Sequence, residues 1–313
     1  MSLAALRPGG EDSKRALARA LAKLERDPDS AASQALLDEA WRHPRAAVVG
    51  VTGPPGVGKS TLCATLVAAW RKAGLTVGVI AVDPSSKTSG GALLGDRVRI
   101  TTDAADEGSF VRSMAARDRL GGLADQTLAA MVVMRALFDR VLIETVGVGQ
   151  SETDVAGVAD TVLFCVQPGS GDSLQFMKAG IVEIPHLVVV TKADTGISAE
   201  KARRDVAGAL SLAGAGPDGW PPRTLAISAR SGAGVDALMA ALEAHRAHLA
   251  QEGRLAIARH RQSEGWVREA LRERYGTRGL ARLAALGLDA ALPAGGQPFE
   301  RLRELSSLLE RPR

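Results

Sequence analysis

The sequence has few cysteines, few aromatic residues and no long apolar run. Its two cysteines, Cys63 and Cys165, stand in apolar segments without a CxxC pattern or a cysteine–histidine cluster, which argues against a disulfide framework and a dedicated zinc site. Only 3% of the residues are aromatic, so a platform for stacking nucleic-acid bases is lacking. No apolar stretch reaches the roughly 18 residues of a membrane span. We therefore expect no nucleic-acid partner and no membrane insertion.

The formal charge of +4 comes from one end of the chain. Residues 241–313 hold 13 Arg and no Lys against 9 acidic residues, a surplus that equals the excess of the whole chain. These arginines alternate with glutamates at helical spacing, which is typical of a salt-bridged helical surface. The N-terminus lacks the order of a secretory signal and a full mitochondrial-type leader, so we expect a bacterial, cytoplasmic protein.

Apolar periodicity divides the 313 residues into three parts. Residues 12–41 have leucines at helical spacing, interrupted at 27–29, and predict two helices. Apolar runs rich in valine then recur, with room for a helix between many of them, which predicts a mostly parallel sheet covered by helices. The predicted strands are 46–51, 76–82, 141–143, 161–166, 187–190 and 225–227.

After about residue 234 the strand pattern ends. Residues 235–275 predict two helices that are broken near Gly253, and 277–310 predict further helical turns interrupted by Pro293 and Pro298. We therefore predict an α/β protein with an N-terminal helical arm (1–45), a central domain (46–234) and a C-terminal helical extension (235–313).

Residues 53–60 read GPPGVGKS and fit the pattern G-x-x-x-x-G-K-[ST] between a predicted strand and a predicted helix. Glycines allow the backbone to wrap a phosphate, so that amide groups and the helix N-terminus point at the anion. Lys59 supplies a charge to the outer phosphates, and the Ser60 hydroxyl coordinates Mg²⁺. The sequence therefore predicts a P-loop nucleotide site.

Magnesium in such a site needs further oxygen ligands, and three carboxylates are candidates. Asp83 and Glu144 each end a predicted strand, where parallel strands direct side chains into the ligand crevice. Asp96 lies in a glycine-rich loop, and a solvated loop aspartate is an equally valid interpretation of it.

The segment 144–150 reads ETVGVGQ and has the composition of a switch. The Gly147 N–H could bond the terminal phosphate and lose that contact after hydrolysis. Gln150 could orient the attacking water, although a surface glutamine in a mobile loop fits equally well. No arginine stands out as a source of transition-state charge, so we expect slow hydrolysis that a partner accelerates.

Two short segments after predicted strands point to guanine. Residues 191–194 read TKAD, and Asp194 can accept hydrogen bonds from guanine N1–H and the 2-amino group, whereas adenine has no donor at those positions. Residues 227–230 read ISAR, where a backbone N–H can donate to guanine O6. Their order behind a P-loop favours GTP over ATP.

These motifs resemble the P-loop GTPases that assist adenosylcobalamin-dependent acyl-CoA mutases, a family with the older name LAO/AO transport system kinases. The resemblance runs from about residue 12 to the end of the chain. It rests on the P-loop and on the segments AVDPSS (81–86), GGALLGDR (90–97), ETVGVGQSE (144–152) and PGSGD (168–172). The segment at 144–152 is the most specific of these, since most GTPases have an aspartate where Glu144 stands.

The resemblance implies a GTPase domain of the class that contains signal-recognition and nickel-insertion GTPases, binding GTP or GDP with Mg²⁺. It implies hydrolysis that gates the loading of the B12 cofactor into a methylmalonyl-CoA mutase or a related mutase and protects that mutase. It also implies a homodimer through the C-terminal helices. The residues implied to bind nucleotide are Gly53, Pro54, Pro55, Gly56, Val57, Gly58, Lys59, Ser60, Thr61, Gly147, Lys192, Asp194, Ser228, Ala229 and Arg230. Those implied to serve the metal or hydrolysis are Lys59, Ser60, Asp83, Asp96, Glu144 and Gln150.

Residues 171–178 resemble the additional switch through which the family signals to its mutase. Asp172, Gln175 and Lys178 would be its polar contacts, although a helix N-terminus capped by Asp172 is an alternative interpretation. One departure from the family concerns Thr191, which replaces a more usual asparagine. We expect this exchange to weaken the tether between the base-recognition segment and the P-loop.

Two other functions remain open at this stage. One is a transport-linked kinase of periplasmic binding proteins, although no separate acceptor-binding segment is evident. The other is a nickel-maturation GTPase, which needs clustered metal ligands. The five histidines are scattered along the sequence, and we interpret the one close pair, His245 and His248, as part of a solvated helix face.

Overall fold

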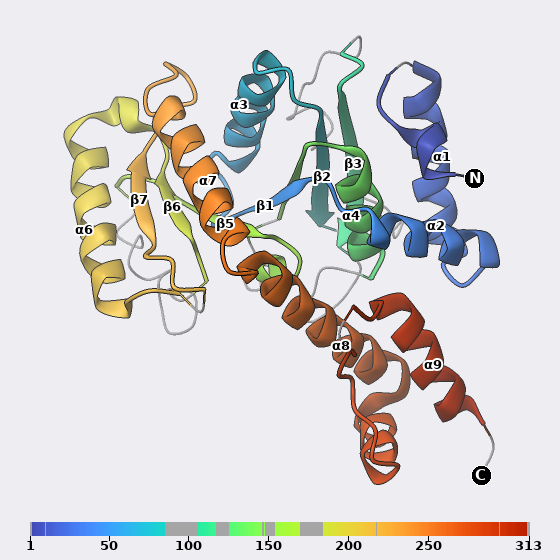
Figure 1. Ribbon diagram of the computed structural model, residues 1–313. Coiled ribbons are helices and arrows are strands. Elements are labelled where there is room, and N and C mark those ends of the chain that lie inside the picture. The colour runs from blue at the N-terminus through green and yellow to red at the C-terminus, as the bar shows by residue number, and fades with distance from the viewer. Residues whose placement is uncertain are drawn as a thin grey trace.

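The computed structural model describes residues 2–9, 11–84, 106–116, 125–145, 147, 154–169, 184–216, 218–293 and 295–311. Within these ranges the chain forms a parallel seven-stranded sheet with the order β3-β2-β4-β1-β5-β6-β7 (Figure 1). The strands are β1 (Ala47–Thr52), β2 (Val77–Pro84), β3 (Ser109–Ala116), β4 (Arg140–Glu144), β5 (Thr161–Val166), β6 (Leu187–Val190) and β7 (Arg223–Ala226). The predicted α/β class is confirmed.

Helices cover both faces of the sheet and extend beyond it at both ends of the chain. The α-helices are α1 (Glu11–Arg26), α2 (Ala31–Arg42), α3 (Lys59–Lys72), α4 (Asp125–Leu137), α6 (Ile197–Ala213), α7 (Val235–Ala250), α8 (Arg254–Ala285) and α9 (Pro298–Glu310). The short 3-10 helices are η1 (Leu3–Leu6), η2 (Val155–Gly157) and η3 (Ala193–Thr195).

Alternation along the buried strands builds two separate cores. In β1, Val49 and Val51 pack with α3 and α7 on one face, while Val48 packs with α4 on the other. A third cluster lies under α6, where Phe164 and Val188 contribute from β5 and β6. Both faces of the central strands are therefore dry, which explains why their sequences are continuously apolar.

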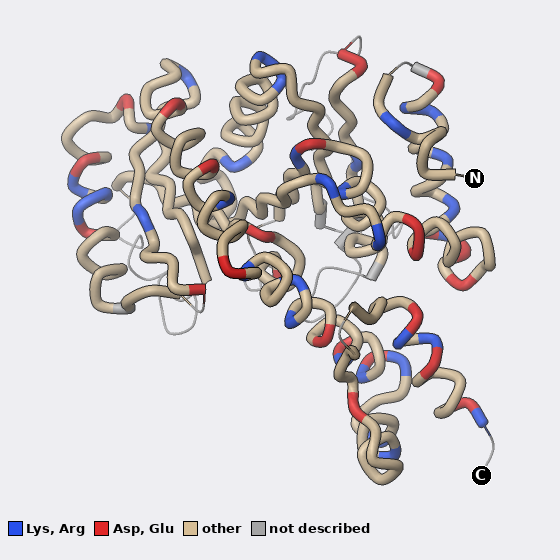
Figure 2. The backbone as a smooth tube through the Cα atoms, viewed as in Figure 1, with Lys and Arg blue, Asp and Glu red and all other residues tan. Residues whose placement is uncertain are grey.

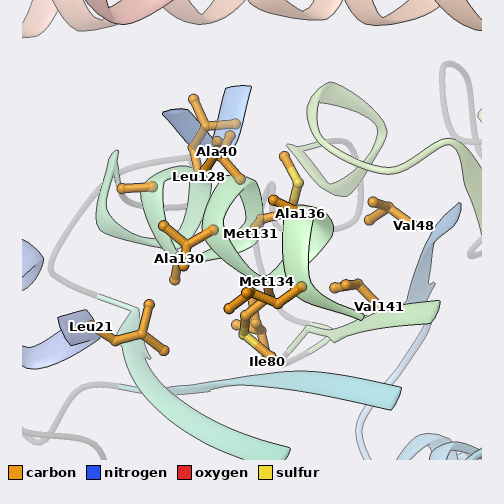
Figure 3. Packing of buried hydrophobic residues seen from close by; sticks show 14 of the residues in the cluster. Leu21, Ala40, Val48, Ile80, Leu128, Ala130, Met131, Met134, Ala136 and Val141 are labelled. Carbon is orange, nitrogen blue, oxygen red and sulfur yellow. The ribbon is translucent and has the colours of Figure 1, made fainter. Parts of the chain in front are cut away.

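The N-terminal helices share a core with the sheet domain. Leu21 of α1 and Ala40 of α2 belong to the same buried cluster as Leu128 and Met134 of α4 (Figure 3). The turn at 27–29 between α1 and α2 lies where the sequence predicts it, and Ser30 caps α2 by accepting a hydrogen bond from Ser33 N–H. The predicted arm is thus packed against α4.

The C-terminal helices have a small core of their own. Leu271 of α8 and Leu305 of α9 are fully buried in it, and α9 folds back beside α8 (Figure 1). Basic and acidic residues are interspersed along both helices, as the spacing predicts (Figure 2). The helical path of α8 breaks at Gly276, which has a φ of 65°, close to the predicted end of a helix at 275. Pro298 begins α9 instead of interrupting a helix, because its fixed φ and missing N–H suit a first helical turn.

The structure departs from the predicted strands in three places, one of which is β2, which ends two residues later than expected. β3 was not predicted, because SFVRSMAA carries polar residues and lies at the sheet edge, where one side lacks a neighbouring strand. β7 begins two residues earlier than expected. Among the described helices, none combines the length and the apolar character that crossing a membrane requires.

Candidate functional site

The predicted phosphate-binding segment forms a loop between the end of β1 and the start of α3. Gly53 has a φ of 132°, and a Cβ there would collide with the carbonyl oxygen of Cys165 in β5. Gly58 has a φ of 100° and precedes the first residue of α3. Both positions therefore require glycine, one for close approach and both for backbone conformation. The N-terminus of α3 faces the loop, as anion binding requires.

Lys59 lies inside this loop. Its side chain is only 7% exposed, and Nζ donates hydrogen bonds to the carbonyl oxygens of Gly53 at 2.7 Å and Pro54 at 3.0 Å. Backbone carbonyls therefore hold the ammonium group inside the loop. This placement suits the predicted contact with the outer phosphates.

Two of the four predicted metal residues meet beside the loop. Ser60 Oγ donates to Glu144 Oε1 at 2.6 Å, and Glu144 is buried at the end of β4, which pairs with β1. The pair presents a hydroxyl and a carboxylate, the hard oxygen ligands that Mg²⁺ prefers. Asp83 lies at the end of β2, but its side chain is outside the described part of the structure, and Asp96 lies outside the described residues.

Gly147 contacts the phosphate loop from the side of β4. A Cβ at this position would overlap the Gly53 carbonyl oxygen and come within 2.6 Å of Lys59 Nζ, and its φ is 76°. The preceding Thr145 is anchored to β1 because its N–H donates to Val51 O at 3.1 Å and its hydroxyl donates to Thr52 Oγ1 at 2.9 Å. The predicted switch glycine therefore adjoins the loop. Gln150, Asp172, Gln175 and Lys178 lie outside the described residues.

The two predicted base-recognition segments meet at the ends of β6 and β7. Asp194 Oδ1 accepts a hydrogen bond from Ser228 Oγ at 2.7 Å, and Ala193 N–H donates to Ile227 O at 3.0 Å. The hydrogen bond from Ser228 lowers the pKa of Asp194 below its usual value, which keeps the carboxylate ionised as an acceptor. Ser228 is buried, whereas Asp194 and Arg230 are exposed. An ionised acceptor is thus available to a purine edge.

Lys192 joins this segment to the phosphate loop from outside. It has a φ of 55°, and Nζ donates to Gln167 Oε1 at 2.8 Å and to Gly56 O at 3.4 Å. The predicted nucleotide-binding residues with described positions therefore lie on neighbouring loops at one edge of the sheet, at the carboxyl ends of β1, β4, β6 and β7.

Thr191 provides a direct tether between the base-recognition segment and the phosphate loop. Its hydroxyl lies 2.7 Å from Val57 O and 3.1 Å from Val166 O, and the residue is buried. A tether between the two segments is therefore present, and the expectation that it is weaker than one made by asparagine stays a prediction.

Thr191→Val tests this tether. The valine fills the same space but leaves the Val57 carbonyl without its donor in a buried site, which costs about 1–3 kcal/mol. We expect a lower urea midpoint and GDP binding weakened roughly fivefold to tenfold by calorimetry, since the loop is less well held. Thr191→Ser keeps the hydroxyl and is the matched control. Wild-type stability and affinity in Thr191→Val would show that the contact is incidental.

The parallel sheet, the glycine loop that opens α3 and the paired Ser60–Glu144 define a P-loop nucleoside triphosphatase domain. The comparisons identify the family. The family described as "Methylmalonyl Co-A mutase-associated GTPase MeaB" matches residues 17–282, and the chain belongs to it.

Relatives with assigned names agree with this family. The chain is 38% identical over 228 residues to "GTPase ArgK" of Escherichia coli, covering 72% of this chain and 69% of that protein. It is 37% identical over 228 residues to "Methylmalonic aciduria type A homolog, mitochondrial" of Mus musculus, covering 72% of this chain and 55% of that protein. A solved structure described as a LAO/AO transport system kinase is 29% identical, with a TM-score of 0.69, and the match covers 99% of this chain and 96% of that one.

At the amino ends of the strands, histidines that are far apart in the sequence lie close together. His245 is fully buried, and its ring centroid lies 4.3 Å from that of His186, which precedes β6. His245 Nε2 lies 3.1 Å from Asp218 Oδ2, and His248 Nε2 lies 2.9 Å from the Asp218 carbonyl oxygen. The interpretation of His245 and His248 as a solvated helix face is therefore wrong for His245. Its burial depends on contacts with Asp218 and His186, which are distant in the sequence.

This cluster has the residue types of a metal site, but its hydrogen bonds oppose one. The Val162 N–H donates to His186 Nδ1 at 2.9 Å, so the proton of a neutral His186 ring must be on Nε2, which faces Asp218. A protonated ring nitrogen has no lone pair for a metal, and metal-binding histidines normally donate through the other nitrogen. His245 thus donates to Asp218, which is also held by Trp220 N–H, while His186 Nε2 lies 3.7 Å from the same carboxylate.

From the buried histidines of this cluster we predict that the free energy of unfolding decreases in acid. Burial, followed by repulsion from His245, lowers the pKa of His186 from 6.5 to about 4. Between these values the unfolded chain binds a proton that the folded chain does not, so stability falls as the pH drops from about 6.5 to 4, by at most about 1.4 kcal/mol per pH unit. Well above pH 6.5 the ring is neutral in both states, so this group adds no pH dependence to the stability.

We expect His186→Asn to reduce this pH dependence, because the amide oxygen can accept from Val162 N–H and does not titrate. The measurement is urea unfolding at pH 7.0 and 5.0 of wild type, His186→Asn and the partly exposed control His260→Asn. An equal loss of stability in wild type and His186→Asn would assign the acid sensitivity to other groups.

Proposed function

We propose that this protein is a GTP-hydrolysing chaperone of an adenosylcobalamin-dependent acyl-CoA mutase, which gates loading of the B12 cofactor and protects the mutase. One observation carries the proposal: a family described by its association with methylmalonyl-CoA mutase matches 17–282, the span that contains the complete set of nucleotide motifs. A cytoplasmic location and a dimer formed through α8 and α9 are parts of the same proposal.

The geometry supports specific roles in GTP hydrolysis. Lys59 and the loop 53–61, through the N–H groups of its non-proline residues, hold the phosphates, and Asp194 accepts from guanine with Ser228, Ala229 and Arg230 on the other side of the base. Ser60 and Glu144 fit Mg²⁺, with Asp83 and Asp96 as further candidates, and the ion would neutralise phosphate charge. Gly147 contacts the loop closely enough to respond to the terminal phosphate, and Gln150 would orient water.

The partner is best tested by affinity capture from the native host with mass spectrometry. Tagged wild-type protein is compared with Lys59→Ala, each in the presence of GDP or a non-hydrolysable GTP analogue. We expect an acyl-CoA mutase in the wild-type samples, in an amount that depends on the nucleotide, and no such dependence with Lys59→Ala. Absence of any acyl-CoA mutase in all four samples would contradict the chaperone proposal.

A transport-linked kinase is the second candidate, because the solved structure with a TM-score of 0.69 is described as a transport system kinase. Incubation with γ-labelled GTP separates the two. Release of free phosphate supports the GTPase, whereas lasting label on a periplasmic binding protein would support the kinase.

A further inference from the structure

A cavity of about 800 Å³ opens at the amino ends of the parallel strands, opposite the carboxyl ends that carry the nucleotide motifs. Asp160 and His186, which directly precede β5 and β6, form part of its lining. This volume is within the range of roughly 300–1,000 Å³ that small-molecule sites occupy. The nucleotide motifs stand at the other ends of the same strands, so the cavity is separate from that site.

One wall of the cavity is a single face of α8. Arg254, Ile257, Ala258 and Arg261 recur at helical spacing and all line it. Ile257 is 50% exposed, which leaves a large aliphatic side chain in solvent on the cavity wall. Trp220 lies in the lining as well. The walls therefore suit a ligand with an apolar body.

The acidic groups of the lining are already used by the protein. Both oxygens of Asp160 accept from Arg259, at 2.8 and 2.7 Å, and one also accepts from Val48 N–H. Both oxygens of Asp218 accept as well, one from Trp220 N–H and the other in its contact with His245. Both carboxylates therefore already have hydrogen-bond partners within the protein and do not need a bound cation.

Arg261 differs from these acids. It is exposed on the cavity wall, and within the described ranges of the chain it has no ion pair or hydrogen bond through its side chain. Arg254, by contrast, donates to Glu252 and to the His248 carbonyl oxygen. The unsatisfied charge of the cavity is therefore positive, and a guanidinium is well shaped to bind a carboxylate or a phosphate.

We propose that this cavity binds a small organic anion, with Arg261 pairing with its carboxylate or phosphate and Ile257 contacting its apolar body. Among the described residues, none that line the cavity belongs to the nucleotide motifs, so we expect the anion to bind whether or not guanine nucleotide is bound. The inference does not rest on the chaperone function proposed above.

Two fluorescent probes test the charge requirement. 8-Anilinonaphthalene-1-sulfonate is an aromatic anion, and N-phenyl-1-naphthylamine has the same aromatic body without the sulfonate. We expect the anion to bind at one site per chain in protein saturated with GDP, and to bind more tightly than the neutral probe. Equal affinity for both probes, or displacement of the anion by GDP, would overturn the proposal.

Variants locate the site. Arg261→Gln should weaken binding of the anionic probe about tenfold and leave the neutral probe unchanged, because one charged hydrogen-bonding pair is lost. Ile257→Ser should weaken both probes. Arg204→Gln, on the exposed side of α6, is the matched control and should bind like wild type. Each variant is checked for wild-type GDP binding and thermal midpoint, and unchanged anion affinity in a folded Arg261→Gln rules out the site.

Competition then identifies the anionic group. Octanoate and octyl phosphate are titrated against the bound anionic probe, with octanol as the neutral control. Displacement by octanoate indicates a carboxylate ligand and displacement by octyl phosphate a phosphate ligand. If neither anion competes better than octanol, the proposed recognition by Arg261 is wrong.

Discussion

Lys59→Ala is expected to abolish measurable binding of GTP and GDP. The Lys59 ammonium is held within the phosphate loop by two backbone carbonyls, and in the proposed site it also donates to the outer phosphates. Hydrogen bonds to charged groups are worth about 1.5–3 kcal/mol each, and losing the two that this ammonium would make to the outer phosphates should weaken binding at least about 100-fold. Calorimetric titration with each nucleotide measures the effect.

The control for this variant is Lys72→Ala, at the far end of the same helix, which should bind GTP like wild type. Circular dichroism and thermal unfolding establish that Lys59→Ala remains folded. A folded Lys59→Ala protein with wild-type GTP affinity would refute the assignment of the phosphate loop.

Asp194→Asn is expected to reduce the preference for GTP over ATP at least about 100-fold. In the proposed site the ionised carboxylate accepts from guanine N1–H and the 2-amino group, whereas an asparagine offers only one acceptor and a donor that opposes the amino group. Sites built around such hydrogen bonds discriminate strongly because a mismatched ligand leaves a polar group unpaired. The readout is the ratio of the two dissociation constants.

Xanthosine triphosphate provides the matched test of the Asp194 assignment. Its 2-oxo group accepts where guanine donates, so it should bind Asp194→Asn better than it binds wild type. Asp205→Asn, on the exposed side of α6, should leave all three nucleotides unaffected. Unchanged GTP preference in Asp194→Asn would mean that another group reads the base.

Most of the proposed nucleotide site can be predicted from short motifs in the sequence. The loop at 53–60 and the segments at 144–147, 191–194 and 227–230 are each short and contiguous, and each follows an apolar strand. Because parallel strands end at one edge of a sheet, their placement on neighbouring loops follows from pattern alone. The edge strand β3 is not predicted from the sequence, because its polar residues interrupt the apolar pattern by which the other strands are recognised.

The histidine cluster at the amino ends of the strands cannot be predicted from sequence patterns, because it depends on contacts between distant segments. His186, Asp218 and His245 come from three separate segments of the chain. Apolar periodicity predicts helices and strands but does not predict that these three segments lie next to each other. Thr191 is a similar case, because its tether depends on where the Val57 carbonyl points. Local sequence determines which residues form a strand or helix, but contacts between distant segments depend on how the completed elements pack.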